Sequence, residues 1–92
     1  MSHVIKFKPA GFTAAKYHEV SAQLVAAGAG APKGRHYHVC YGDANGVDIL
    51  DVWENMEDFN AFGKTLIPIM KSLGVDVGEP NIQEIHAIIL GK

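Results

Sequence analysis

The chain has 92 residues, of which 48% are hydrophobic, and it carries 8 Lys and Arg against 10 Asp and Glu. This length fits one domain, residues 1–92, and leaves no room for a separate cofactor domain. The net charge is −2 and no basic cluster is present, so nucleic-acid binding is not expected. No stretch is long or apolar enough to span a membrane, and the first residues do not form a signal-peptide pattern.

Cys40 is the single cysteine of the chain, so no internal disulfide can form. A reducing compartment fits this composition, and we expect a soluble cytoplasmic protein. A chain this short buries only about 60–65% of the surface that its unfolded form exposes. The large apolar fraction therefore suggests that part of it lies in a subunit interface.

A first strand is predicted over residues 3–8, where apolar and polar side chains alternate until Pro9 and Gly11 interrupt them. Thr13 is a favourable N-cap for the helix that we expect over residues 14–27, and Gly28 ends it. Phe12 and Tyr17 have the spacing of a hydrophobic staple across the start of this helix. Its apolar face consists of Tyr17, Val20, Leu24 and Ala27.

Residues 28–34 form a glycine-rich loop, which does not resemble a phosphate-binding loop because no Lys-Ser/Thr pair or helix start follows. Residues 35–42 and 47–54 are predicted to be two strands of a hairpin. They are joined through residues 43–46, and the Asn45-Gly46 pair is the strongest short hairpin signal in a sequence.

A second helix is predicted after Asn55, which is its N-cap, with Asp58 at the reciprocal position of a capping box. Pro68 lies inside the pattern and should bend the helix or end its regular part, and Gly74 closes it. Residues 82–90 are predicted to be the last strand, apolar enough near its end to be buried on both faces. The helix face that points to the core is formed by Phe59, Phe62, Leu66, Ile69 and Leu73.

The predicted order of elements is therefore β-α-β-β-α-β, an α+β arrangement. A four-stranded antiparallel sheet of this kind carries both helices on one face and leaves the other face bare. In so small a domain the bare face needs a partner, and the apolar last strand supports the same conclusion. We expect a homodimer in which two sheets stack face to face.

The residues also resemble a known family. His38 in the second strand, the turn that ends in Asn45-Gly46, and the stretch Asp51-Val52-Trp53-Glu54-Asn55 followed by Phe59 and Phe62 resemble the antibiotic-biosynthesis-monooxygenase-like branch of the dimeric α/β-barrel superfamily. The resemblance covers nearly the whole chain as an order of elements, and its specific part is residues 51–62. It implies a ferredoxin-like fold, a sheet-to-sheet dimer and a cavity between sheet and helices.

The activities that this resemblance implies are diverse. They include cofactor-free oxygenation of aromatic polyketides, haem degradation and lactone isomerisation, so the fold is better indicated than the reaction. The quinol-oxygenating and haem-degrading branches carry a histidine on the second helix. Phe62 and Gly63 occupy the neighbouring positions here, which argues against haem ligation by this helix. No cofactor is expected.

A candidate site lies on one face of the hairpin. Side chains alternate across a strand, so His36, His38 and Cys40 share a face, and an even-length turn places Ile49, Asp51 and Trp53 on the same side. His38 and Asp51 are expected to lie cross-strand, as the catalytic pair or as a hydrogen-bond anchor. Trp53 would provide a flat wall with a free N–H, and Tyr17, Phe62 and Leu66 would close the cavity. His36 and His86 are further candidate ligand-binding residues.

Other readings of these residues remain open. His38 and Asp51 can also be a structural pair that satisfies its own hydrogen bonds. His36 and His38 could chelate a metal with His86 or Asp51 as a third ligand, although the spacing is weak evidence and no metal is expected. Arg35 at the mouth of the second strand could meet an anionic substrate or be solvated.

Three further residues carry simpler expectations. Cys40 is expected to be a small buried apolar residue, because no Lys or Arg shares its face to lower its pKa. His3 and His18 are expected on the surface.

Three functions follow as alternatives. In the first, the protein is an enzyme, a cofactor-independent monooxygenase or isomerase that acts on a small apolar ring compound. Alternatively it binds a small metabolite without changing it, or it is a structural dimerisation domain without a cavity. The substrate and pathway are not indicated by any motif.

Overall fold

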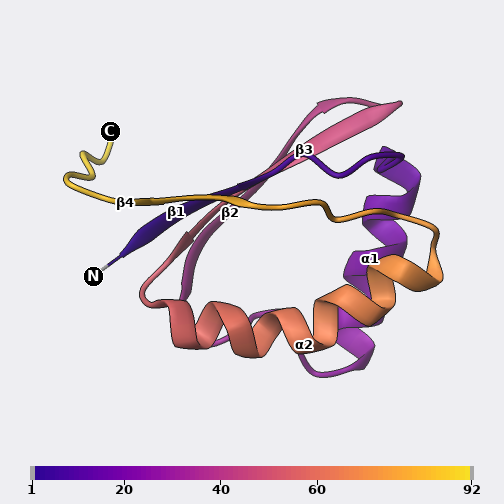
Figure 1. Ribbon diagram of the computed structural model, residues 1–92, viewed down its shortest axis with the longest axis horizontal. Helices are drawn as coiled ribbons and strands as arrows, with labels where there is room; N and C mark the ends of the chain where they lie inside the picture. Colours follow the sequence, from indigo (N-terminus) through magenta and orange to yellow (C-terminus); the bar gives the residue numbers. More distant parts are fainter. Residues whose placement is uncertain (1, 92) are drawn as a thin grey trace.

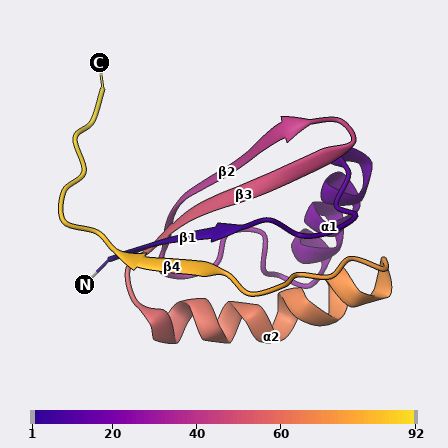
Figure 2. The same cartoon turned by 45° about the horizontal axis from the view of Figure 1, so that its top comes forward.

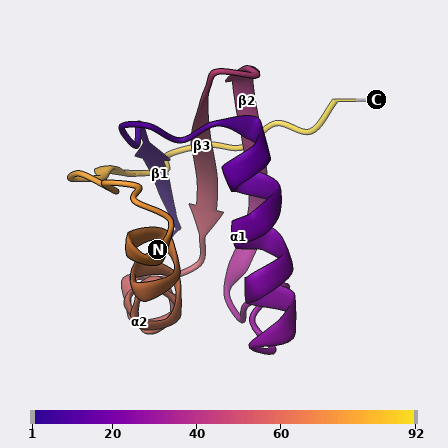
Figure 3. The ribbon, with the colours of Figure 1, turned by 90° about the vertical axis from the view of Figure 1, so that its right-hand side faces the viewer.

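The computed structural model describes residues 2–91 and contains two helices and four strands. The strands form one antiparallel sheet in the order β2-β3-β1-β4, and both helices cover the same face of it (Figure 1, Figure 3). The predicted ferredoxin-like α+β fold is thereby confirmed. The elements are β1 (His3–Phe7), α1 (Ala14–Ala26), β2 (Arg35–Asp43), β3 (Gly46–Trp53), α2 (Met56–Ser72) and β4 (Asn81–Glu84).

Helix α1 begins and ends at the signals that the sequence contains. The Thr13 hydroxyl accepts a hydrogen bond from the Lys16 backbone N–H at 3.2 Å, and Gly28 follows the helix with φ of 78°. The rings of Phe12 and Tyr17 pack edge to face with 6.0 Å between their centroids. This start holds Tyr17 in the first turns of the helix, on the side that packs against the core.

The hairpin between β2 and β3 is confirmed, but its turn is stabilised by the Asp43 side chain and not by the backbone conformation of Asn45-Gly46. The Asp43 carboxylate accepts the backbone N–H groups of Asn45 and Gly46 at 2.9 and 3.2 Å. Asn45 and Gly46 do not have positive φ, whereas Gly42 has φ of 126°. The loop still contains an even number of residues, so β2 and β3 keep the expected register, in which His38 lies opposite Asp51.

A β-bulge interrupts β2 near its beginning. The register shifts between Arg35 and Tyr37, so Arg35 pairs with Trp53 and Tyr37 pairs with Val52. The prediction that His36 shares the face of His38 assumed regular alternation, and it is wrong because a bulge places two residues opposite one. His36 is exposed to solvent.

Helix α2 uses the predicted cap. Asn55 Oδ1 accepts the Asp58 backbone N–H at 2.8 Å, and the Asn55 amide donates to the Asp58 carboxylate at 3.2 Å. The helix continues through Pro68 to Ser72, so this proline does not end it, and Gly74 follows with φ of 71°. Within residues 2–91, neither helix has the length and apolar character needed to cross a membrane.

The last strand is shorter than predicted. β4 ends at Glu84, and the residues after it run away from the sheet (Figure 1, Figure 2). Glu84 is paired with His3, the first residue of β1, and the Ile85 N–H donates to the Ser2 carbonyl at 2.9 Å. Ile89 and Leu90 are 93% and 72% exposed. The predicted strand over 82–90, buried on both faces, is therefore not formed in the single chain.

The core lies between the sheet and the two helices. Trp53 and Ile5 are its largest fully buried side chains. His3 departs from the expected surface position, because it is half-buried and its Nδ1 atom is buried without a hydrogen-bond partner. His18 is exposed as expected. The core cluster consists of Ile5, Phe7, Phe12, Val20, Leu24, Val47, Ile49, Trp53, Phe62, Met70 and Val75.

The cap of α2 supplies a test of this architecture. Asn55→Ala removes the acceptor for the Asp58 N–H and should lower the free energy of unfolding by about 1 kcal/mol in urea denaturation. Asn60→Ala is the matched control, since Asn60 is exposed inside the same helix and alanine is the better helix former there. Equal unfolding midpoints for the two variants would contradict the capping role.

Candidate functional site

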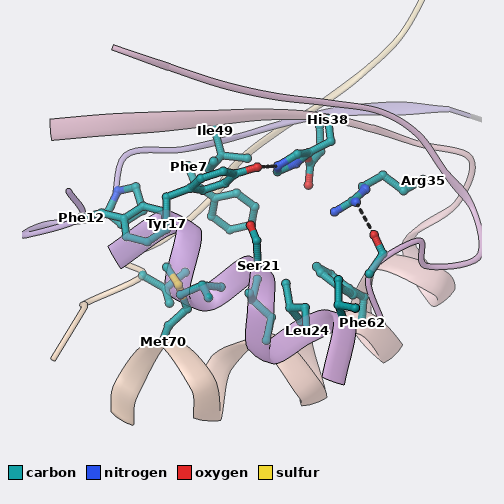
Figure 4. Close-up of a pocket in the computed structure, with 17 residues that line it drawn as sticks. Phe7, Phe12, Tyr17, Ser21, Leu24, Arg35, His38, Ile49, Phe62 and Met70 are labelled. Atoms are coloured by element: carbon teal, nitrogen blue, oxygen red, sulfur yellow. Dashed lines mark hydrogen bonds and ion pairs between the residues drawn. The ribbon is translucent and has the colours of Figure 1, made fainter. Parts of the chain in front are cut away.

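Three side chains from different elements form a hydrogen-bonded chain. Asp51 on β3 is only 2% exposed, and its Oδ1 lies 2.6 Å from His38 Nδ1 on β2. His38 Nε2 lies 2.7 Å from the Tyr17 hydroxyl on α1, as the dashed line in Figure 4 marks. The Tyr17 and His38 rings are nearly parallel, with an angle of 11° between their planes. The sheet register and the start of α1 together set this chain.

The Asp51 carboxylate at one end of the chain determines which atom donates and which accepts in each hydrogen bond. An ionised carboxylate has no proton to donate, so the His38 Nδ1–H donates to Asp51 and Nε2 is left as the acceptor for the Tyr17 O–H. The lone pairs of the Tyr17 oxygen remain free to accept a hydrogen bond or a proton from a bound molecule. The chain can therefore carry a proton from the cavity towards Asp51.

Trp53 supports this chain and does not form a wall of the cavity. Its indole N–H donates to Asp51 Oδ2 at 3.3 Å, and the side chain is fully buried. Its ring packs against Phe59 and Phe62 with centroid distances of 5.6 and 5.4 Å. The predicted wall with a free N–H is therefore wrong, since the indole is a core group that uses its donor to orient Asp51.

The chain opens into a cavity of about 240 Å³ between the sheet and the helices (Figure 4). Phe62 and Leu66 from α2 line it, as predicted, together with Tyr17 from α1. Mostly apolar walls with a few convergent polar groups are typical of small-molecule sites. The volume is below the 300–1,000 Å³ of typical drug-sized pockets, so it suits a single ring with short substituents. The polar lining residues are Tyr17, Ser21, Arg35, His38 and Asp51.

Two predicted site residues are not brought to this cavity. His36 is exposed at the bulge, and His86 is exposed on the segment after β4. Within residues 2–91, no three His, Cys, Asp or Glu side chains are gathered closely enough to hold a metal ion. The alternative metal site of His36 and His38 with His86 or Asp51 is therefore not assembled.

Sequence reasoning missed two features of the cavity. It placed Tyr17 over the cavity without its bond to His38, because strand and helix periodicity do not give a helix-to-sheet distance. It left open whether Arg35 meets an anionic substrate or is solvated, and it did not foresee that the bulge turns Arg35 onto the face of Trp53 and into the cavity lining. No sequence signal marks the bulge. Ser21, one turn of helix after Tyr17, could have been found from its helical spacing.

A second hollow of about 890 Å³ lies along the outer side of α2, next to residues 74–80. Its lining is largely apolar, and its ionisable residues are Lys64, Lys71 and Asp76. It lacks the linked hydroxyl, imidazole and carboxylate of the smaller cavity. We therefore place the candidate site at the smaller one.

No protein-family model matches the sequence, and no curated protein matches it significantly. Several solved structures share the fold. SnoaB, a cofactor-independent oxygenase from Streptomyces nogalater, has a TM-score of 0.62 at 18% identity, with 96% of this chain and 94% of that chain covered. A candidate antibiotic biosynthesis monooxygenase from Chloroflexus aurantiacus has a TM-score of 0.63 at 13% identity, covering 99% and 100%. The protein YJCS has a TM-score of 0.65 at 12% identity, covering 94% and 100%.

These likenesses confirm the expected resemblance at the level of the fold. The identities lie far below those that carry an activity from one protein to another, so the neighbours do not identify the reaction.

Cys40 offers a test of the environment beside the site. Burial raises the pKa of its thiol, and the Asp48 carboxylate raises this pKa further. A raised pKa means less thiolate at pH 8, so iodoacetamide should alkylate the folded protein several times more slowly than it alkylates a cysteine peptide. Asp48→Asn should speed the reaction, and Glu84→Gln, an exposed carboxylate on β4, should not. Alkylation at the peptide rate would contradict this environment.

Proposed function

We propose that the protein binds a small apolar ring compound in the 240 Å³ cavity and removes a proton from it with the Tyr17–His38–Asp51 chain. The observation that carries the proposal is the end of this chain, a tyrosine hydroxyl that faces an apolar cavity while an imidazole accepts its proton. Removal of an activated proton requires only a positioned base, so the proposal needs no cofactor.

Each residue has a separate role in this step. The Tyr17 oxygen takes the proton of the bound molecule as its own proton passes to His38 Nε2. His38 then carries two protons, and the Asp51 carboxylate at 2.6 Å from Nδ1 stabilises the imidazolium. Trp53 acts through Asp51 as a positioning residue. The apolar walls strengthen these interactions because they exclude water.

The anion that results has two productive fates. Return of the proton to a different carbon gives an isomerase, with no change in composition. Reaction of the anion with molecular oxygen converts a CH2 group to a carbonyl and releases one water, which is a monooxygenation. The shared fold with SnoaB, described as a cofactor-independent oxygenase, supports the second fate.

Binding without chemistry is the second candidate. It is favoured by the fact that each polar member of the chain already has a partner, since His38 Nε2 is bonded to Tyr17 and both Asp51 oxygens accept hydrogen bonds. Such a chain can serve as structure alone, with the cavity holding a metabolite. Turnover measurements separate the two candidates.

We also propose that the protein is a homodimer and works in the cytoplasm. The sheet face opposite the helices carries Tyr37, Val39 and Tyr41 on β2, which are 47%, 47% and 41% exposed. A second copy stacked on this face would cover these three side chains. Ile89 and Leu90 on the segment after β4 are exposed as well. The lone Cys40 suits a reducing compartment.

The proton-transfer role is tested with two single-ring probes. Conversion of cyclohex-3-enone to cyclohex-2-enone moves one proton and is followed by ultraviolet absorbance, and oxygen uptake is followed with cyclohexane-1,3-dione, whose C2 is an activated CH2 group. Tyr17→Phe, His38→Gln and Asp51→Asn should each lower the rate by about 10²–10⁴-fold. The matched controls are Tyr41→Phe and His36→Gln, which change the same residue types outside the cavity. Turnover that survives His38→Gln in a folded protein, or saturable binding without turnover, would reject the enzymatic proposal.

The dimer is tested by sedimentation at micromolar concentration. Val39→Glu places a charge in the middle of the exposed face and should yield monomers, because a buried unpaired carboxylate is costly. Val25→Glu is the control, since Val25 is 68% exposed on α1 and lies away from that face. A wild-type protein that sediments as a single chain would overturn the proposal.

A further inference from the structure

Among residues 2–91, Arg35 is the one charged side chain of the cavity lining that lies outside the proton-transfer chain. It occupies this place because of the bulge in β2, which pairs Arg35 with Trp53 and leaves His36 exposed. In a regular strand, His36 would have taken the inward position. Bulges are known to re-aim a side chain next to a site, and here the re-aimed side chain is a cation.

The guanidinium of Arg35 is poorly satisfied by the protein. Its only hydrogen bond within residues 2–91 goes to the Gly30 carbonyl at a long 3.4 Å (Figure 4). Within the same residues, no carboxylate lies within ion-pair distance of it. Its remaining contact of note is the face of Phe62, with 5.5 Å from the guanidinium carbon to the ring centroid. A guanidinium has five N–H donors, so most of its hydrogen-bonding capacity is unused.

We propose that the cavity takes a single-ring carboxylate, and that Arg35 binds the carboxylate group while the opposite end of the ring meets Tyr17. This inference deepens the proposed function and rests on it for the identity of the reacting end. The planar guanidinium matches a carboxylate in a two-bond geometry, which a neutral carbonyl group cannot reproduce. The Phe62 face under the cation holds it in a fixed plane.

Arg35 and the proton-transfer chain line the same cavity from different positions. Arg35 and His38 are three positions apart on β2, which is at most roughly 10 Å between their Cα atoms at about 3.3 Å per residue. Both side chains point into the cavity from the same strand (Figure 4). The Tyr17 hydroxyl is bonded to His38, so a ring whose carboxylate meets Arg35 would turn its opposite carbon towards the proton-transfer chain. The cavity volume of about 240 Å³ leaves little room for a second ring.

The experiment compares 4-hydroxybenzoate with its neutral isostere 4-hydroxybenzamide by isothermal titration calorimetry. We expect the wild-type protein to bind the carboxylate about tenfold more tightly or better, since charge-assisted bonds are the stronger kind. Arg35→Gln should remove this preference, and Arg35→Lys should keep only part of it. Trp53 fluorescence is not the chosen signal, because the indole does not line the cavity.

Lys33→Gln is the matched control. It removes the same charge from an exposed position two residues away, outside the cavity lining. It should leave the preference for the carboxylate unchanged, which separates a local contact from a general effect of net charge. Unfolding midpoints in urea show whether each variant is folded.

Equal affinities of the acid and the amide for the wild-type protein would overturn the inference. So would a carboxylate preference that survives in folded Arg35→Gln, or the absence of binding of both probes at millimolar concentration. Failure of the proposed function has a different signature. Carboxylate selectivity that depends on Arg35, without turnover of any probe, would support the ligand assignment and reject the proton transfer.

Discussion

The buried carboxylate of Asp51 is the group on which the candidate site depends. It is almost completely removed from solvent, and its two oxygens are bonded to His38 and to Trp53. A carboxylate in such surroundings is tolerated only when its hydrogen bonds are satisfied, and here two side chains from the sheet satisfy them. Because the bonds fix the orientation of the imidazole, the Tyr17 hydroxyl on a separate element finds its acceptor in place.

Trp53 contributes both to the stability of the core and to the geometry of the candidate site. The indole of Trp53 is at the same time the largest fully buried core side chain and a donor to Asp51. The core therefore positions the carboxylate, the carboxylate positions the imidazole, and the imidazole faces the cavity through Tyr17. A site supported in this way has its carboxylate fixed by the core, while the Arg35 guanidinium makes only a long 3.4 Å hydrogen bond to the Gly30 carbonyl within residues 2–91.

The sheet face opposite the helices carries exposed apolar side chains. Tyr37 and Val39 on β2 and the apolar residues after β4 are more exposed than an isolated small domain normally allows. In the single chain the residues after β4 stay in water, since the pairing of β4 with β1 ends at Glu84, opposite His3. A partner surface is the simplest physical solution, and it would leave the cavity face, which lies on the opposite side of the sheet, accessible to a ligand.

The order of elements, both helix caps, the hairpin and the cross-strand position of His38 and Asp51 could all be predicted from the amino-acid sequence. These features depend on local signals, such as Thr13 and Asn55 at helix starts and the alternation along strands, which act over a few residues. Tertiary structure alone decided the bulge beside His36, the bond between Tyr17 and His38, and the burial of the Trp53 indole. It also decided that His86 lies outside the site, on the exposed segment that follows the end of β4 at Glu84. Such outcomes depend on distances between elements far apart in the chain, and side-chain periodicity does not contain those distances.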